Sequence, residues 1–316
     1  MNRSYDRWTF VNANDLHVGS PRSYRFDPSR NENWQTARGQ ILALRPDLLL
    51  VGGDLTMDGC LHDDELRTVK EDLESLPFPS YVVPGNHDVG NKFTPVQGAW
   101  GYDDIEWNVK SEWLRQFASH FGPLPWTFLH KNVRFTGFYE AVAGSGLPEE
   151  AQLWDFLERL PSLPAPAHHV AMLHSPLFFD HMDEPTYDPT VREEFVRWFF
   201  NLDRGPRFRM LEALRAARVD LVITAHLHVR RPVQTVEGVG FLKAPAAGGK
   251  PQYGDVWPDG DDTLGFHRFD VTDERIDITF IPLEKVSRAE GYGPRGHPPR
   301  HLRDYSLAWE KGMRTP

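Results

Sequence analysis

The sequence has only one cysteine, Cys60, in 316 residues. An intrachain disulfide and a metal cluster held by thiolates are therefore excluded. Basic residues are also in deficit, because 35 Lys and Arg face 45 Asp and Glu and leave a net charge of −10. General binders of nucleic acid or of anionic membranes need a basic surface, so neither class is expected. An anionic substrate held by a local positive centre remains compatible with this charge.

Long apolar runs are missing as well. None approaches the roughly 18 apolar residues of a membrane span, and the first residues hold no apolar stretch of signal-peptide length. The longest runs, such as residues 48–51, have the length of a strand. We therefore expect no membrane partner and a cytoplasmic location. Hydrophobic residues at 40% and charged residues at 25% are ordinary for a globular chain with a substantial core.

Short apolar runs alternate with helical patterns over most of the chain. Apolar residues at spacings of three and four predict helices over 33–44, 64–76, 107–121 and 206–217. Runs of Val, Ile, Leu and aromatic residues predict strands over 8–11, 47–51, 81–83, 169–173, 220–223, 232–236, 239–243, 263–271 and 275–281. Alternating strands and helices indicate βαβ units around a central sheet. We expect one domain over 1–286, with a loop-and-helix insertion over about 176–205 and a C-terminal extension over 287–316.

Polar residues follow directly on five of these strands. Ligands of open α/β sheets bind outside the carboxyl ends of the strands, so five such clusters can converge on one cleft. Carboxylates, amides and imidazoles without sulfur suit Mn, Fe or Zn ions. The candidate residues are Asp15, His17, Asp54, Asn86, His87, Asp88, His174, His226 and His228.

Each cluster taken alone also has an ordinary structural explanation. Asp15 suits a helix cap or a turn, and residues 84–88 suit a tight turn because Gly and Asn tolerate positive φ. His174 alone would be a buried histidine with its hydrogen bonds satisfied. The joint order of the clusters, each at a strand end, makes coincidence implausible and indicates one composite site.

The order of these motifs resembles that of the calcineurin-like metallophosphoesterases. It runs Asp-x-His at 15–17, Gly-Asp at 53–54, Gly-Asn-His-Asp at 85–88, His174 and His-x-His at 226–228. The resemblance extends from about residue 10 to residue 283. It implies an α/β fold, a four-layer α-β-β-α sandwich of two mixed β-sheets flanked by helices. It also implies a binuclear metal centre at the strand ends.

The resemblance further implies a role for each residue. Asp54 would bridge two metal ions (Mn, Fe or Zn), and a hydroxide that bridges them would attack the phosphorus of a phosphate ester. His87 would protonate the leaving oxygen, and Asp88 would hold the ring of His87 by a hydrogen bond. The remaining metal ligands would be Asp15, His17 and His228 for the first ion and Asn86, His174 and His226 for the second.

Two positions depart from patterns of the family. Ala225 stands where a glycine usually precedes His-x-His, which removes no ligand. Purple acid phosphatases place a tyrosine just after the bridging aspartate, whereas residues 54–59 of this chain contain no tyrosine, and Leu55 follows Asp54. A tyrosinate-coloured ferric centre is therefore not expected.

The substrate is less sharply indicated. Residues 52–59 resemble bacterial cyclic-nucleotide phosphodiesterases, whereas residues 85–91 and the long insertion are similar to protein-serine/threonine phosphatases. We expect a phosphodiesterase acting on a small, nucleotide-like phosphate ester. A phosphomonoesterase or a phosphatase of phosphoproteins is the alternative. A non-catalytic metal-binding scaffold, such as the retromer subunit that lacks the catalytic histidine, is disfavoured because His87 is present.

Residues that would contact the substrate are left open. Arg22, Arg25 and Arg30 could bind a phosphate, but long charged side chains are mostly solvated, and a solvated loop is the favoured interpretation. Aromatic residues of the loops could stack on a base or pack a lid, and the sequence favours neither; they are Trp100, Tyr102, Phe178, Phe179 and Tyr187. The oligomeric state is not predicted.

Overall fold

The computed structural model describes residues 7–21, 23, 25–99, 105–251 and 256–289. The expected C-terminal extension lies outside these residues from position 290 onward, as do Arg22, Trp100 and Tyr102. The one-domain boundary at residue 286 stays a prediction.

The described chain forms two mixed β-sheets. Strands β1, β2 and β3 of the first sheet are parallel, whereas β10 is antiparallel to both of its neighbours, β1 and β11. The order of the first sheet is β11 (Ile276–Pro282), β10 (Gly265–Val271), β1 (Trp8–Ala13), β2 (Leu48–Gly52) and β3 (Ser80–Val83).

In the second sheet, β5, β6, β7 and β9 are parallel, and the two edge strands are antiparallel to their neighbours. The order is β4 (Trp126–His130), β5 (Val133–Gly137), β6 (His168–Met172), β7 (Leu221–Thr224), β9 (Val239–Lys243) and β8 (Gln234–Val236).

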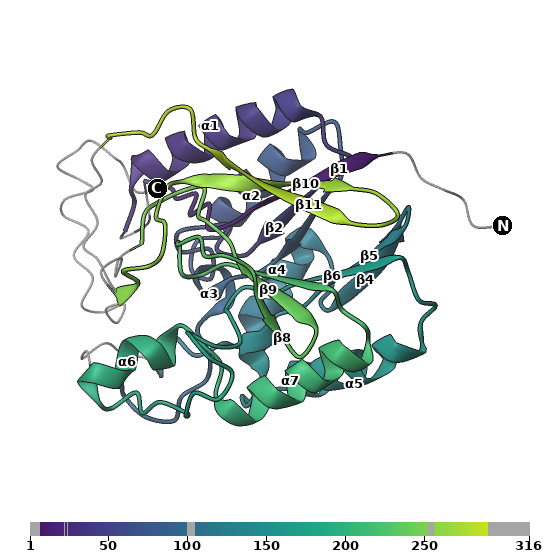
Figure 1. Ribbon diagram of the computed structural model, residues 1–316. Coiled ribbons are helices and arrows are strands. Elements are labelled where there is room, and N and C mark those ends of the chain that lie inside the picture. The colour runs from purple at the N-terminus through teal and green to yellow at the C-terminus, as the bar shows by residue number, and fades with distance from the viewer. Residues whose placement is uncertain (1–6, 22, 24, 100–104, 252–255, 290–316) are drawn as a thin grey trace.

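Helices cover the outer faces of both sheets. Figure 1 shows α1 (Pro28–Leu44) and α2 (Asp63–Glu74) above the first sheet, and α5 (Pro148–Arg159) and α7 (Arg204–Ala216) below the second. The expected four-layer α-β-β-α sandwich is confirmed. The remaining helices are α3 (Asn86–Val89), α4 (Ser111–Phe121) and α6 (Arg192–Phe199), with short 3-10 turns at Glu140–Val142 and Leu160–Ser162.

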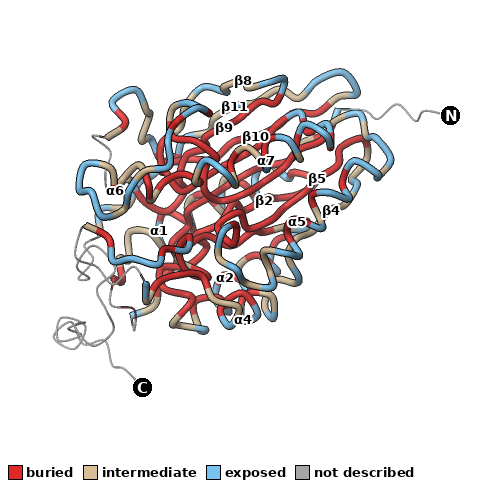
Figure 2. Tube along the Cα trace, turned by 90° about the horizontal axis from the view of Figure 1, so that it is seen from below, coloured by how far each residue is buried: buried red, intermediate tan, exposed pale blue. Residues whose placement is uncertain are grey.

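Alternation along the strands divides the core into layers. Successive side chains of a strand point to opposite faces, so Phe10 packs between the sheets while Val11 packs under the helices. The ring of Phe10 stacks on Phe269 at a centroid distance of 4.4 Å and meets Phe135 edge-on at 5.0 Å. Figure 2 shows the strands as the buried centre of the molecule, with exposed loops around them.

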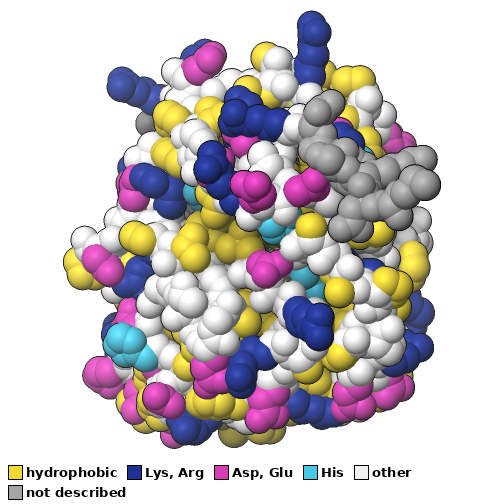
Figure 3. All heavy atoms as spheres, turned by 45° about the vertical axis from the view of Figure 1, so that its right-hand side comes forward, with side chains coloured by type: hydrophobic (Ala, Val, Ile, Leu, Met, Phe, Trp, Pro, Cys, Tyr) yellow, Lys and Arg dark blue, Asp and Glu magenta, His cyan; other side chains and the backbone are white. Residues whose placement is uncertain are grey.

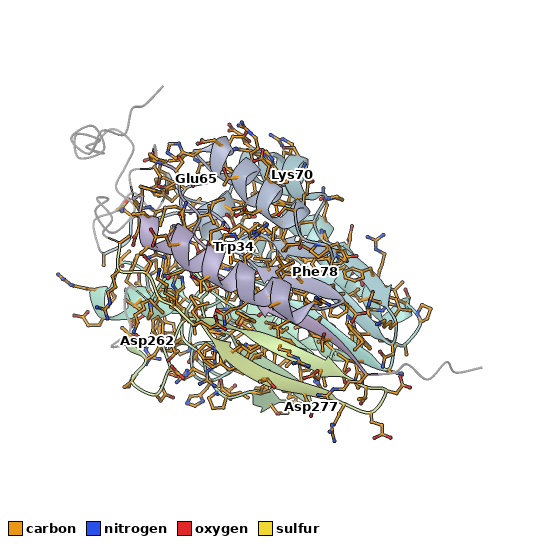
Figure 4. The ribbon with its side chains drawn as sticks, turned by 90° about the horizontal axis from the view of Figure 1, so that it is seen from above. Trp34, Glu65, Lys70, Phe78, Asp262 and Asp277 are labelled. Atoms are coloured by element: carbon orange, nitrogen blue, oxygen red, sulfur yellow. The ribbon has the colours of Figure 1, made fainter. Side chains whose placement is uncertain are left out.

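The helix α1 illustrates how local sequence sets an element. Asp27 caps its N-terminus by accepting a hydrogen bond from the amide of Ser29, and Pro28 occupies the first helical position. Trp34, Ala37 and Ile41 share one buried face, and the Trp34 indole donates to Asp72 of α2 at 2.8 Å. Figure 4 shows the outer layer of α1 and α2, with Trp34 and Glu65 marked.

Two strands and two α-helices were not predicted from the sequence. The hairpin of β4 and β5 was missed because β4 is a partly exposed edge strand without a continuous apolar run. The helix α5 was missed although Leu153, Trp154 and Leu157 form its buried face. The short helix α3 has one turn, which is below what periodicity detects.

Candidate metal centre

The loops after five strands bring all seven predicted ligands together. Asp15 and His17 follow β1, Asp54 follows β2, and Asn86 begins α3 just after β3. His174 follows β6, and the pair at 226 and 228 follows β7. These loops are joined by backbone hydrogen bonds, for example from the His17 amide to the Asp54 carbonyl at 2.9 Å.

The ligand atoms form two groups that share Asp54. Within each group, one ligand atom from each residue lies within 4.8 Å of the others. Asp54 turns Oδ2 to one group, 3.6 Å from His17 Nε2, and Oδ1 to the other, 3.4 Å from His174 Nε2. Asn86 Oδ1 joins the second group, 3.2 Å from His174 Nε2. The two groups are Asp15, His17, Asp54 and His228, and Asp54, His174 and His226.

Backbone carbonyls fix the tautomers of three histidines. Nδ1 of His174 lies 2.9 Å from the Gly52 carbonyl, and Nδ1 of His228 lies 2.7 Å from that of Gly249. Nε2 of His226 lies 3.4 Å from the Phe199 carbonyl. Because a carbonyl only accepts, each of these nitrogens donates, and the other ring nitrogen is directed to the ligand group. Metal-binding histidines are held in this way.

Two further observations fit cations at this position. Asp15 Oδ2 and His17 Nδ1 are buried without a hydrogen-bond partner among the described residues. His17 Nε2 and His228 Nε2 approach to 3.0 Å, where two ring nitrogens repel unless a proton or a cation lies between them. A set of buried carboxylates, imidazoles and an amide suits divalent ions such as Mn, Fe or Zn. The residues therefore fit two metal ions.

The pKa values of the ligand side chains are shifted by burial and by one another. Burial lowers the pKa of His17 and His226, and lowers that of His228 to about 3, so these rings are neutral near pH 7. Burial also opposes the charge of Asp54, but His174, His87 and His17 together outweigh burial and hold the pKa of that carboxyl well below its usual range. For His174, burial opposes the proton, yet Asp54 raises the pKa to about 10.

The backbone at the centre is strained. Five of the seven predicted ligands have positive φ, which non-glycine residues rarely adopt; they are Asp15 (51°), His17 (48°), Asp54 (48°), His226 (67°) and His228 (56°). Such conformations cost of order 1–3 kcal/mol each and cluster at functional sites. The strain supports a functional origin of this geometry.

His87 lies beside the centre and is oriented by other groups than expected. Its Nε2 is 3.9 Å from Asp54 Oδ2, and its Nδ1 is 2.6 Å from the Met57 carbonyl. Asp88 was expected to hold this ring. Instead, its carboxylate accepts from the amides of Leu55, Thr56 and Gly85, so it braces the loop after β2 against the start of α3. The expected contact between Asp88 and the His87 ring is wrong.

Two arginines that follow β1 lie near the centre, Arg25 in the loop and Arg30 in the first turn of α1. Arg25 is 8% exposed, and its Nη2 lies 3.0 Å from His87 Nδ1. Arg30 is close enough to act on the charges of His17 and Asp15. The favoured interpretation as a solvated basic loop is therefore wrong for Arg25, whose partner is the buried Asp58 rather than water.

The insertion over 176–205 reaches the centre through α6. Besides the Phe199 carbonyl, the rings of Phe199 and Phe200 lie 5.2 and 4.7 Å from that of His226. Phe178 and Phe179, each 1% exposed, pack in the interior, where Phe179 stacks on Trp257. These two rings therefore pack the insertion and are not free to stack on a base.

Glu140 is a site residue that sequence reasoning missed. It is fully buried, and its carboxylate accepts from the amides of His174 at 3.0 Å and Ser175 at 2.6 Å. Burial raises its pKa. The sequence did not indicate this role, because Glu140 lies far from the ligand motifs, in a turn after the unpredicted strand β5.

One face of the molecule is hollowed where histidine side chains are visible. Figure 3 shows these rings in a hollow bordered by hydrophobic and acidic side chains.

Among the described helices, none has both the length and the apolar character needed to cross a membrane.

Known proteins are similar to this chain in sequence and in fold. The chain is 24% identical over 302 residues to the serine/threonine-protein phosphatase CPPED1 of Danio rerio, across 88% of this chain and 85% of that protein. It is 27% identical over 113 residues to a probable glycerophosphodiester phosphodiesterase GpdQ of Arcobacter nitrofigilis, across 35% of each.

The fold is similar to that of the purple acid phosphatase PPD1 of yellow lupin (Lupinus luteus), with a TM-score of 0.61 at 11% identity. That match covers 92% of this chain and 54% of the lupin chain. The model of the calcineurin-like phosphoesterase family matches residues 9–230. The chain therefore belongs to the calcineurin-like phosphoesterases and is a metal-dependent phosphohydrolase.

Proposed function

We propose that this chain hydrolyses phosphate esters at a centre of two metal ions bridged by Asp54. The observation that carries the proposal is the position of the Asp54 carboxylate, whose two oxygens face two separate ligand groups. One ion would be held by Asp15, His17 and His228, and the other by Asn86, His174 and His226. When bound, the ions would activate water and offset negative charge on the phosphate.

The side chains of this protein would divide the remaining work. His87 points Nε2 towards Asp54 and holds Nδ1 on a carbonyl, so the ring has one nitrogen directed to the reacting group. Burial lowers its pKa to about 4, and Arg25 acts in the same direction. A phosphate anion beside Nε2 would favour the protonated ring, which would then donate a proton to the leaving oxygen.

We infer that the substrate is a phosphomonoester, and that a phosphorylated protein side chain fits best. The support is the extent of similarity, because the match to the CPPED1 phosphatase covers 88% of this chain and that to the GpdQ phosphodiesterase only 35%. A small phosphodiester remains the second candidate, because residues 52–59 have the pattern of the cyclic-nucleotide phosphodiesterases.

A panel of esters assayed with added Mn²⁺ tests the proposal. The panel contains p-nitrophenyl phosphate, bis(p-nitrophenyl) phosphate, a cyclic nucleotide and a phosphoserine peptide. We expect hydrolysis that depends on metal, with the monoesters turned over faster than the diesters. Faster turnover of the diesters would replace the substrate assignment. Metal binding without hydrolysis of any ester would refute the enzyme role and favour a scaffold.

A further inference from the structure

A buried hydrogen-bond network supports the ring of His87 from behind. The Met57 carbonyl lies 2.6 Å from His87 Nδ1, and a carbonyl this close requires a hydrogen on that nitrogen. The same carbonyl accepts from Arg25 Nη2 at 2.8 Å. Arg25 in turn is paired through Nη2 with Asp58 Oδ1. His87 is thus linked to Arg25 through one shared acceptor.

The network is anchored on both of the loops that supply the first ligands. Asp58 is fully buried and accepts from Ser23 Oγ at 2.6 Å, in the loop after β1. The Asp58 amide donates to Glu65 of α2 at 2.7 Å, and Glu65 also accepts from the Ser20 amide at 2.8 Å. Glu65 is marked in Figure 4. Both sides of the Arg25–Asp58 pair are therefore fixed to the rigid part of the fold.

We infer that Arg25 is a positioning residue for His87, acting through the Met57 carbonyl. This inference rests on the proposed function, in which His87 donates the proton. Nη2 has two hydrogens, and its acceptors are the Met57 carbonyl and Asp58 Oδ1. His87 Nδ1 lies 3.0 Å from Nη2, but it donates to the Met57 carbonyl and so accepts no bond from the guanidinium. Its hydrogens are therefore engaged in holding the loop. Without the guanidinium, Asp58 would be a buried charge without this partner, and the loop that carries the Met57 carbonyl would relax.

The role predicts a signature that a phosphate ligand would not show. A general acid matters in proportion to the basicity of the leaving oxygen. Arg25→Ala should therefore reduce kcat on an alkyl phosphate by about 10–100-fold, a share of the 10²–10⁴-fold typical of a general acid. On p-nitrophenyl phosphate, whose leaving group hardly needs a proton, the loss should stay below about threefold, with little change in KM.

A double-variant cycle makes the test sharper. If Arg25 acts through His87, then Arg25→Ala combined with His87→Ala should be no slower on the alkyl phosphate than His87→Ala alone. Arg25→Lys should restore part of the activity. Arg38→Ala is the matched control, because Arg38 of α1 bonds to α2 near Ser75, away from the centre. Asp58→Asn, a milder change of the same network, replaces Arg25→Ala if that variant does not fold.

The outcomes separate this inference from the proposed function. Equal losses on both esters, a raised KM, or additive losses in the double variant would show that Arg25 binds the phosphate, and would overturn the inference alone. A wild-type protein that hydrolyses neither ester with Mn²⁺ would refute the proposed function and this inference with it. An effect of Arg25→Ala that depends on the leaving group in the wild-type background, and that disappears in the His87→Ala background, would support both.

Discussion

The contact between Glu140 and the loop of His174 leads to a sharp prediction. Glu140→Gln keeps the size of the side chain but leaves one oxygen to accept where the carboxylate offered two. Its amide group would then face either the His174 or the Ser175 amide, donor against donor. A buried donor left without a partner costs about 1–3 kcal/mol. In a chain of this length that corresponds to a fall in Tm of roughly 2–5 °C.

Glu140→Gln should also weaken the binding of one of the two metal ions. Groups that orient metal ligands typically contribute about 10–100-fold to metal affinity. Glu140 holds the backbone of His174, a ligand of only one of the two groups, so only the ion in that group should bind more weakly. Titration of Mn²⁺ into the apoprotein in a chelator buffer measures both affinities.

Glu150→Gln is the matched control. Glu150 also caps two backbone amides with one carboxylate, those of Gly144 at 2.7 Å and Gly146 at 2.8 Å, but it lies on an exposed segment away from the ligands. Water can replace its bonds, so both metal affinities should stay unchanged. A Glu140→Gln protein with lowered Tm and two unchanged affinities would show that Glu140 is structural only.

Four other substitutions test separate parts of the account. His87→Ala should keep both metal ions and lose most turnover on alkyl phosphates but much less on p-nitrophenyl phosphate; loss of metal would show instead that the histidine is a ligand. Asp54→Ala should fail on every ester and bind neither ion tightly, whereas Asp15→Ala should weaken one ion only, as elemental analysis would show. Burial lowers the pKa of Lys243 to about 7, so the unfolded chain binds more protons than the folded one above that pH, and the stability contribution of this residue rises with pH up to about 10.5. Lys243→Met should therefore raise Tm at pH 6.5, and the gain should shrink at pH 9.5; a difference that does not change with pH would contradict the shift.

The strand ends could be predicted because their signals are local. Each ligand motif follows an apolar run, and the carboxyl ends of parallel strands meet at one edge. Asp54 and His174 therefore came together in the structure from sequence positions 120 residues apart. Such juxtaposition requires only the order of strands and the common direction of their ends.

The surroundings of the ligands could not be predicted, because they depend on packing between distant segments. The ring of His87 rests on a carbonyl, which every residue has, so no residue type marks the Met57 position. Arg25 was assigned to solvent because its partner Asp58 lies 33 residues away in another loop. Glu140 acts through backbone amides, which likewise leave no pattern in the sequence.

The central claim is a pair of metal ions that share Asp54, and a crystal structure of the metal-replete protein tests it most directly. Crystals grown with Mn²⁺ should show two anomalous peaks per chain, one beside each oxygen of the Asp54 carboxylate. Asp15, His17 and His228 should contact the first peak, and Asn86, His174 and His226 the second. A single peak, or two peaks of which Asp54 touches only one, would contradict the account.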